Sequence, residues 1–411
     1  MAGQTTCPGC YAEIPVHEGL RTWCDQCNWN VGGDAPPADE GFLARQYVRI
    51  GERHGKSVLE KLKTTPAQNL RPRWTIRKGI AFVLAASVHL LSLALFASGL
   101  FVIAIGLPEI GPIPLGAGLC TFAWLMRPKP GKVPSQDIAS RKDFPTLHAL
   151  VNEVVYELGG RPINNIVVNE DFNAAYGVVG WRRVPVLWIG LPLWMALHPQ
   201  ERLALLGHEV AHGVNGDVIR GFLVGSALRA LDEWIGFFRA PLQQAAPGGY
   251  LAWVLSIPFT ALQSLLAQLL WLDQQQAEYF ADYLGSTIAG TDAVVTTLER
   301  MGSSEHLDDV LLRNAYSTAQ SGATILGLFR QRIAELPDRE WQRLARSGQR
   351  ERARIDASHP PTAYRIGFLG AHVVTKPRMI AAENVMRTID VELCALQETL
   401  GRRLIARYAC D

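Results

Sequence analysis

An uncharged run of 29 residues, Gly79 to Leu107, constrains this 411-residue chain more than any other feature. About 20 consecutive apolar residues are enough for a helix to cross a bilayer. A second uncharged run of 17 residues, Ile110 to Met126, follows after a proline-rich turn. The two runs predict a transmembrane helical hairpin over residues 80–105 and 109–127. A buried helical hairpin in a soluble core is the alternative, and the position is too far from the N-terminus for a signal peptide.

Charges beside the hairpin predict its orientation, because basic residues collect on the cytoplasmic side. The turn carries only Glu109, whereas both flanks are basic: Arg71, Arg73, Arg77 and Lys78 before, and Arg127, Lys129 and Lys132 after. We expect a multi-pass protein of the cell (inner) membrane whose two flanks face the cytoplasm. Residues 250–272 are also uncharged but contain Pro258. They can span, re-enter or lie on the interface, and we expect contact with the lipid bilayer.

Four cysteines near the N-terminus form two C-x2-C pairs separated by 13 residues: Cys7, Cys10, Cys24 and Cys27. Two such pairs can hold one structural zinc ion, which replaces a core that so few residues cannot build. Disulfides are the alternative, which a cytoplasmic location disfavours. Because this segment has few basic residues, of which Arg21 is the main one, we expect no nucleic-acid partner; the net charge of +2 argues neither for nor against one.

Two histidines and a glutamate form the pattern H-E-x-x-H at His208, Glu209 and His212, inside a run with helical spacing. Residues four apart lie on one face of a helix, so both imidazoles can bind one metal ion. Glu209 then takes a proton from a metal-bound water, as in zinc peptidases. The alternatives are a chance match and a pair of histidines that faces solvent.

A catalytic zinc site needs a third protein ligand. Glu278 and Asp282 are four residues apart in an apolar setting. We predict that Glu278 binds the metal and that Asp282 accepts the free N–H of a ligating imidazole; a solvated pair on a helix is the alternative. Asp217 follows a turn signal after His212 and is expected to anchor the motif helix or orient a ligand, although a plain helix end explains it as well.

A third motif, Ser358-His-Pro-Pro-Thr-Ala-Tyr-Arg365, lies far down the chain. With Gly207–Asp217 and Glu278–Asp282, it resembles the HtpX and CAAX-prenyl-endopeptidase family of integral-membrane zinc metallopeptidases. The segment that begins at Asn173 and Ala174 is similar to the Asn-Ala-Phe segment on the edge strand of that family. The resemblance covers roughly residues 135–375.

The resemblance implies a role for each matching residue. His208, His212 and Glu278 would bind the catalytic zinc, and Glu209 would act as general base and later as general acid. Asp282 and Asp217 would support the ligands, Asn173 and Ala174 would bind substrate, and His359 or Arg365 would stabilise the anionic intermediate or bind substrate. One departure is that Gln274-Gln275 stands where the family usually has Ser-Arg, which removes a cation near the site.

The expected fold is α+β and mostly helical, with a zincin-like metalloprotease domain that contains a small sheet. The expected organisation is a zinc ribbon at 1–35, a linker and connecting helix at 36–77, the hairpin at 78–127, and the peptidase domain at 135–411 with 250–272 at the membrane. The segment from Arg339 to Arg354 holds six arginines, and we expect a solvated helix there, with lipid contact as the alternative.

The predicted function is a membrane-anchored zinc endopeptidase that acts on peptides or on proteins, including membrane-associated ones, with one catalytic and one structural zinc ion. The alternatives are a catalytically silent zinc-ribbon adaptor that binds peptides, and a ribbon-based nucleic-acid or regulatory protein. The four residues His208, Glu209, His212 and Glu278 argue against the adaptor. The sequence leaves the oligomeric state open.

Overall fold

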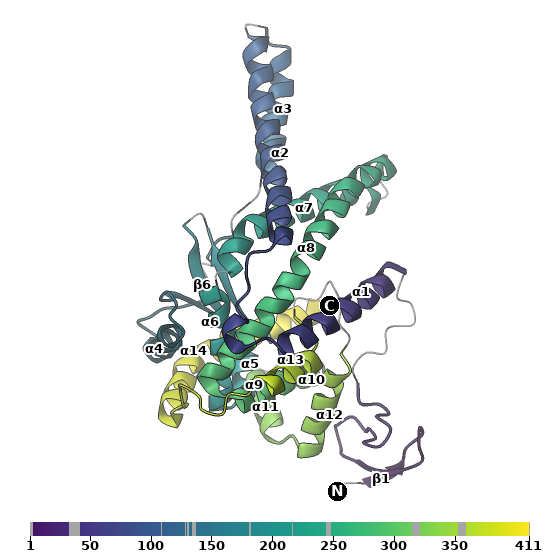
Figure 1. Ribbon diagram of the computed structural model, residues 1–411, viewed down its shortest axis with the longest axis vertical. Coiled ribbons are helices and arrows are strands. Elements are labelled where there is room, and N and C mark those ends of the chain that lie inside the picture. The colour runs from purple at the N-terminus through teal and green to yellow at the C-terminus, as the bar shows by residue number, and fades with distance from the viewer. Residues whose placement is uncertain are drawn as a thin grey trace.

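The fold is described from a computed structural model, for residues 3–32, 42–107, 109–127, 129, 131–133, 137–180, 182–215, 217–243, 248–314, 321–351 and 359–410. A helical body carries the N-terminal ribbon on one side, and a column of two helices projects from it on the other (Figure 1). The C-terminal helix returns to the body.

The N-terminal segment is a two-stranded antiparallel hairpin with cysteine turns. Strand β1 (Gly3–Thr6) pairs with β2 (Glu13–Val16). The buried core of this segment is small and consists of Cys7, Ile14 and Cys24, with Cys10 and Ala12 packed against them. So few buried side chains cannot stabilise a domain by hydrophobic burial alone.

The projecting column is the hairpin that the uncharged runs predict. After α1 (Phe42–Lys63) and the short η1 (Ala67–Asn69), α2 (Ile76–Gly106) runs outward and α3 (Pro112–Leu125) returns. A Cβ atom on Gly99 would lie 2.7 Å from the carbonyl oxygen of Gly116, so glycine is needed where the two helices touch. Much of the apolar surface of α2 stays exposed, Leu90 and Phe101 among it, as expected for a helix in lipid.

The helix lengths revise the membrane prediction. Helices α2 and α8 (Gly249–Ala289) are both long and apolar enough to cross a membrane. The predicted second span, 109–127, becomes a 14-residue helix, which at 1.5 Å per residue covers only about 21 Å of a bilayer core of about 30 Å. Pro112 begins α3 and the residues before it form the turn, so the second helix is shorter than predicted, although it still returns along α2 toward the body.

Helix α8 joins the column to the body. Its N-terminal half packs against α7 (Asp217–Gln243) and α2 around small side chains, which include Ala81, Ala85 and Ala227. Its C-terminal half enters the body beside α6 (Pro199–Asn215). A single continuous helix therefore connects an apolar surface with the interior of the body.

The sheet of the body has four strands in the order β3-β4-β6-β5. These are β3 (Ile138–Ala139), β4 (Asn165–Asn169), β5 (Ala174–Val179) and β6 (Val184–Gly190); β4 and β6 are parallel and the other pairs antiparallel. Strand β5 is an edge strand, whereas β6 is internal and carries Pro185 near its start.

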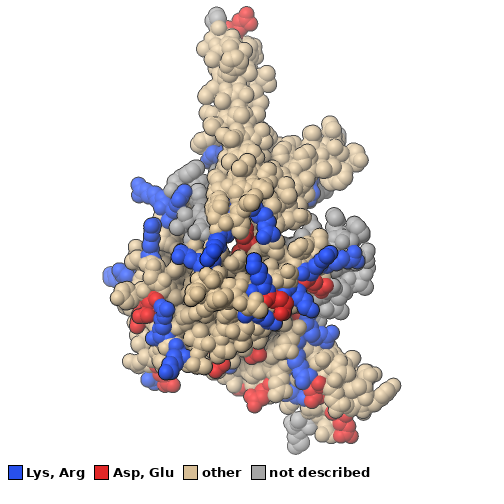
Figure 2. All heavy atoms as spheres, viewed as in Figure 1, with Lys and Arg blue, Asp and Glu red and all other residues tan. Residues whose placement is uncertain are grey.

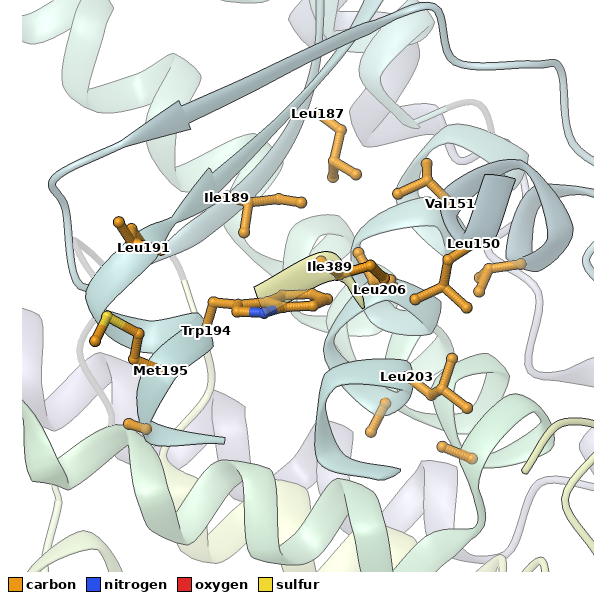
Figure 3. Packing of buried hydrophobic residues seen from close by; sticks show 14 of the residues in the cluster. Leu150, Val151, Leu187, Ile189, Leu191, Trp194, Met195, Leu203, Leu206 and Ile389 are labelled. Atoms are coloured by element: carbon orange, nitrogen blue, oxygen red, sulfur yellow. The ribbon is translucent and has the colours of Figure 1, made fainter. Parts of the chain in front are cut away.

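The main core lies between this sheet and helices α4 (Pro145–Glu157), α5 (Leu191–Ala196) and α6. Leu187 and Ile189 point from β6 toward Trp194, Leu203 and Leu206 (Figure 3). The remaining elements pack around this core: α9 (Thr291–Arg300), η2 (Met301–Ser303), α10 (Ser304–Asn314), α11 (Gly322–Ala334), α12 (Asp338–Gln349), α13 (Thr362–Ala371) and α14 (Glu383–Cys410).

The arginines of α12 contradict the prediction of a solvated helix, because they bind the ribbon. Arg343 is fully buried and donates to the carbonyl oxygen of Val31 at 2.7 Å, while Glu340 neutralises it at 2.7 Å. Arg339 donates to the carbonyl oxygen of Trp23 at 2.9 Å and lies over its ring. The ribbon is thus attached by guanidinium groups that satisfy backbone carbonyls.

Candidate metal centres

The H-E-x-x-H motif lies on α6, whose start and packing follow from its sequence. The Glu201 carboxylate accepts the backbone N–H of His198 at 2.7 Å, which satisfies a free donor at the helix start. Leu203, Leu206 and Val210 face the main core. The opposite face presents His208 and His212, whose Nε2 atoms are 3.3 Å apart.

Helix α8 brings Glu278 to this pair because two glycines allow close packing. A Cβ atom on Gly207 would meet the Cα atom of Gly285 at 3.1 Å, and one on Gly285 would lie 3.4 Å from the backbone nitrogen of His208. The carboxylate oxygens of Glu278 are each 3.5 Å from one imidazole, Oε2 from Nε2 of His208 and Oε1 from Nε2 of His212.

These separations match those of a zinc site. Tetrahedral zinc binds nitrogen and oxygen at about 2.0–2.2 Å, which puts neighbouring ligand atoms about 3.3–3.5 Å apart. The three observed separations are 3.3, 3.5 and 3.5 Å. The residues therefore fit a zinc ion held by two imidazole nitrogens and by the Glu278 carboxylate, one oxygen of which faces each imidazole.

Asp282 and Arg365 lie behind His208. Asp282 is fully buried, and its Oδ1 atom is 3.0 Å from Nδ1 of His208 and 2.6 Å from Nη2 of Arg365. Burial disfavours a charged His208 ring, but hydrogen bonds to Asp282 and then Glu278 outweigh it and raise the pKa of His208 to about 10. The surroundings therefore favour a cation at this position, either a proton or a metal ion.

A small cavity of about 100 Å³ opens beside the metal ligands. Glu209 lines it, and among the described residues no side chain is hydrogen-bonded to its carboxylate. His359 lies at the opening with its side chain 47% exposed, and its Nδ1 atom is 2.6 Å from Glu278. Asn173 and Ala174, at the start of β5, also line the cavity, as does Arg365.

Other cavity residues gave no signal in the sequence. Leu205 comes from α6, Val294 and Leu298 from α9, and Met301 from η2. They are apolar residues in amphipathic helices, so their pattern indicates only a buried face. Their position beside the metal ligands follows from the packing of α9 against α6 and α8.

Two features singled out in the sequence, Asp217 and the Gln274-Gln275 pair, make no described side-chain contact with the metal-binding residues. Asp217 is the first residue of α7, but its side chain is not among the described ones. Gln275, one of the two glutamines that replace the expected Ser-Arg pair, is buried, and its amide nitrogen has no hydrogen-bond partner among the described residues. The cavity receives no cation from this segment.

The ribbon forms a second group of ligands. The Sγ atoms of Cys7 and Cys27 are 3.6 Å apart and those of Cys10 and Cys24 are 3.5 Å apart, and all four cysteines are free. Zinc binds sulfur at about 2.3 Å, so neighbouring sulfurs in a tetrahedral site lie about 3.8 Å apart. The backbone N–H of Cys27 lowers the pKa of Cys24 to about 7 despite desolvation. At Cys10, a backbone hydrogen bond at Ala12 lowers the pKa, but the thiol of Cys24 and burial outweigh it and raise the pKa to about 12, so the protons are divided unequally within the group.

A third cluster consists of Glu305, His306 and Glu340, whose ligand atoms are close enough to bind a metal ion. Its positive charge, however, comes from an arginine side chain. Arg343 lies between the carboxylates and donates to both oxygens of Glu340. A guanidinium already provides the positive charge, so this cluster is an ion-pair network that supports the ribbon contact.

Comparison with known proteins identifies the family. A model of peptidase family M48 matches residues 141–373, more than half of the chain. The chain belongs to this family. The predicted resemblance and the zincin-like, mostly helical fold class are thereby confirmed.

Relatives named Protease HtpX match this M48 chain. Those from Alkalilimnicola ehrlichii and a Psychrobacter species are 29% and 28% identical over 163 and 165 residues, and each match covers 37% of this chain and 54% of the relative. One from Acinetobacter baumannii is 27% identical over 184 residues, with 38% and 59% covered. The chain thus spans somewhat over half the length of these relatives. No solved structure gives a significant match.

Proposed function

We propose that this M48 chain is a membrane-anchored zinc-dependent endopeptidase. The observation that carries the proposal is the placement of His208, His212 and Glu278 around one point, beside a cavity that His208 and Glu209 line. A structural ion-pair cluster has no need to gather two imidazoles and a carboxylate around one point.

Each residue receives a role from its position. His208, His212 and Glu278 would hold the zinc ion, and Asp282 would keep the His208 ring oriented through its contact with Nδ1. The bound zinc would polarise the scissile carbonyl and acidify water. Glu209 takes the proton of the attacking water and later gives it to the leaving amine, a role for which its unengaged carboxylate is suited.

His359 and Arg365 receive separate roles. The exposed ring of His359 faces the cavity opening and can donate to the anionic intermediate. Arg365 makes two bonds to Asp282, with Nε and Nη2 at 2.8 and 2.6 Å. We therefore assign Arg365 to positioning His208 through Asp282 rather than to direct substrate binding.

The substrate is proposed to be an extended peptide. Strand β5 is the free edge of the sheet and begins at the cavity with Ala174, so a peptide can pair with its backbone beside the metal ligands. Leu205, Val294, Leu298 and Met301 offer an apolar pocket for one side chain of that peptide. We expect cleavage next to a small or medium apolar residue.

The proposed location is the cell membrane, with ribbon and peptidase domain in the cytoplasm. The basic flanks of the hairpin and its acidic turn support this orientation. Single cysteines introduced at Glu109 and at Gly370, in a chain that keeps the four ribbon cysteines but lacks Cys120, Cys394 and Cys410, should differ in labelling by an impermeant thiol reagent on intact cells. Labelling at 109 without labelling at 370 is expected; the reverse pattern would reject the orientation.

Two glutamate variants test the catalytic proposal. Glu209→Gln should keep the catalytic zinc and lower cleavage of a labelled unfolded protein by about 10³-fold or more, because only the base is lost. Glu278→Gln should lose both zinc and cleavage. Glu153→Gln, on the exposed surface of α4, is the control with the same charge change.

The outcomes separate the enzyme from an adaptor. An adaptor would bind unfolded protein equally well in all three variants and cleave it in none. Full cleavage by Glu209→Gln would reject the base assignment.

A further inference from the structure

A large cavity lies outside the peptidase site. Its volume is about 600 Å³, within the usual range of ligand sites, and it lies between α1, the segment that leads into α2, and α8. Lys61, Arg71, Arg73 and Arg77 line it, together with the polar side chains of Asn69 and Thr75. The peptidase mechanism uses none of these residues.

The charge of this cavity is strongly positive and not compensated. Among the described residues, no carboxylate lies within ion-pairing distance of Lys61, Arg71, Arg73 or Arg77. The lining carboxylate, Asp273, is buried, accepts the Thr75 hydroxyl at 3.2 Å and has Lys78 at 3.9 Å. Four cationic side chains around one cavity repel each other, so an anion bound in the cavity would stabilise them.

The cavity also lies where the uncharged parts of two apolar helices, α2 and α8, end. On α2, the uncharged run begins directly after Arg77 and Lys78. On α8, the uncharged run ends at Leu272, and Leu272, Asp273 and Gln276 form one wall of the cavity. Two helices far apart in the sequence therefore place their apolar boundary at the same cavity.

Exposed side chains mark the same level. Trp74 is 60% exposed and Ile76 is 85% exposed, next to the cavity and at the start of α2. Tryptophan at such a boundary is typical of the membrane interface. Lys and Arg side chains gather just below the place where the apolar column joins the body (Figure 2).

We propose that this cavity binds the phosphate headgroup of an anionic phospholipid. Arginine and lysine hold phosphate oxygens by charge-assisted hydrogen bonds, and the side-chain amide nitrogen of Asn69 can add a neutral one. The acyl chains would lie along the exposed apolar surfaces of α2 and α8. The lipid would then join α1, which leads from the ribbon, to both membrane helices.

The test is lipid binding by the full chain purified in detergent, measured by native mass spectrometry with phosphatidylglycerol as the probe. One bound phosphatidylglycerol is expected, at least about tenfold tighter than phosphatidylcholine. Arg71→Gln with Arg77→Gln should weaken binding by about tenfold or more, and Arg71→Lys with Arg77→Lys should restore most of it. The lysine pair also shows that the fold survives.

A matched pair of substitutions distinguishes the cavity from general surface charge. Arg127→Gln with Lys132→Gln removes the same charge at the other end of the hairpin, outside the cavity. This pair should bind the lipid within about twofold of the unchanged chain. Equal loss in both pairs, or unchanged binding in the Arg71/Arg77 glutamine pair, would overturn the proposal.

Soluble competitors identify the source of the phosphate. Inorganic phosphate and glycerol 3-phosphate at the lipid concentration should leave the lipid bound, because they lack the acyl chains. Complete displacement would instead indicate a site for soluble phosphate esters and reject the lipid. The measurement does not depend on peptide cleavage, so an inactive chain would leave its result unchanged.

Discussion

The two candidate metal centres are built in opposite ways. The ribbon cysteines all fall between residues 7 and 27, whereas the peptidase ligands come from residues 208–278 and their supports reach residue 365. The ribbon has a core of a few side chains, but the peptidase ligands sit on helices that pack into the main core. A local site can therefore create a fold around its metal, while a distributed site needs the fold first.

The largest effect should come from the ribbon cysteines. Cys24→Ser with Cys27→Ser removes a structural zinc whose binding is worth about 10–16 kcal/mol in comparable small domains, so residues 3–32 should unfold. Elemental analysis should fall from two zinc ions per chain to one, and proteolysis should cut the segment rapidly. Cys394→Ser, at an exposed cysteine on α14, is the control. Two retained zinc ions in the double variant would contradict the ribbon assignment.

A change at the contact between α6 and α8 should have the reverse effect on the two zinc ions: the catalytic zinc is lost and the ribbon zinc is kept. Gly285→Val pushes side-chain atoms toward the carbonyl oxygen of Ala204 and the backbone nitrogen of His208, at 3.3 and 3.4 Å from the Cβ position. The helices must separate, so Glu278 should leave the histidine pair. We expect loss of the catalytic zinc and a decrease in activity of about 100-fold or more, with the ribbon zinc retained.

Gly327→Val is the matched control for that change. Gly327 is also helical, but a Cβ atom there would meet nothing within 4 Å. It should keep both zinc ions and nearly full activity. If Gly285→Val keeps its activity as well, the close approach of the helices does not position Glu278.

The smallest effect should come from the carboxylate behind His208. Asp282→Asn keeps the shape but removes the charge that His208 Nδ1 and Arg365 share. Loss of such a supporting group typically costs about 10–100-fold in metal affinity. Competition with a zinc chelator should measure this change, and Asp309→Asn on the surface of α10 should leave affinity unchanged. Equal affinities in both variants would limit Asp282 to a structural role.

The attachment of the ribbon shows where sequence patterns fail. Six arginines in Arg339–Arg354 predict a solvated helix, yet Arg343 has no exposed surface and binds the carbonyl oxygen of Val31. The pattern has no information about a partner more than 300 residues away. Burial is possible because Glu340, one helical turn earlier, neutralises the guanidinium.

The membrane segments show a similar limit. Uncharged length correctly predicted a long apolar helix at α2, but it overestimated α3, where Pro112 shortens the helix. For residues 250–272, the sequence did not decide between a spanning, a re-entrant and an interfacial segment, because Pro258 suggested an interruption. The structure continues one helix from Gly249 to Ala289 through that proline. Packing against α7 and α2 can hold a helix together where local propensity would break it.

The sequence alone determined what depends on short spacing: two cysteine pairs, two histidines on one helical face, and an apolar run long enough for a bilayer. These patterns work because ligand geometry and helix periodicity act over a few residues. The sequence proposed Glu278 as the third ligand, and the tertiary structure places it beside the histidines. Only the tertiary structure decided that Arg365 binds Asp282 and that four separate cations line one cavity. Those contacts join residues that no local rule connects, because they arise from how closely α6 and α8 pack and where the apolar helices end.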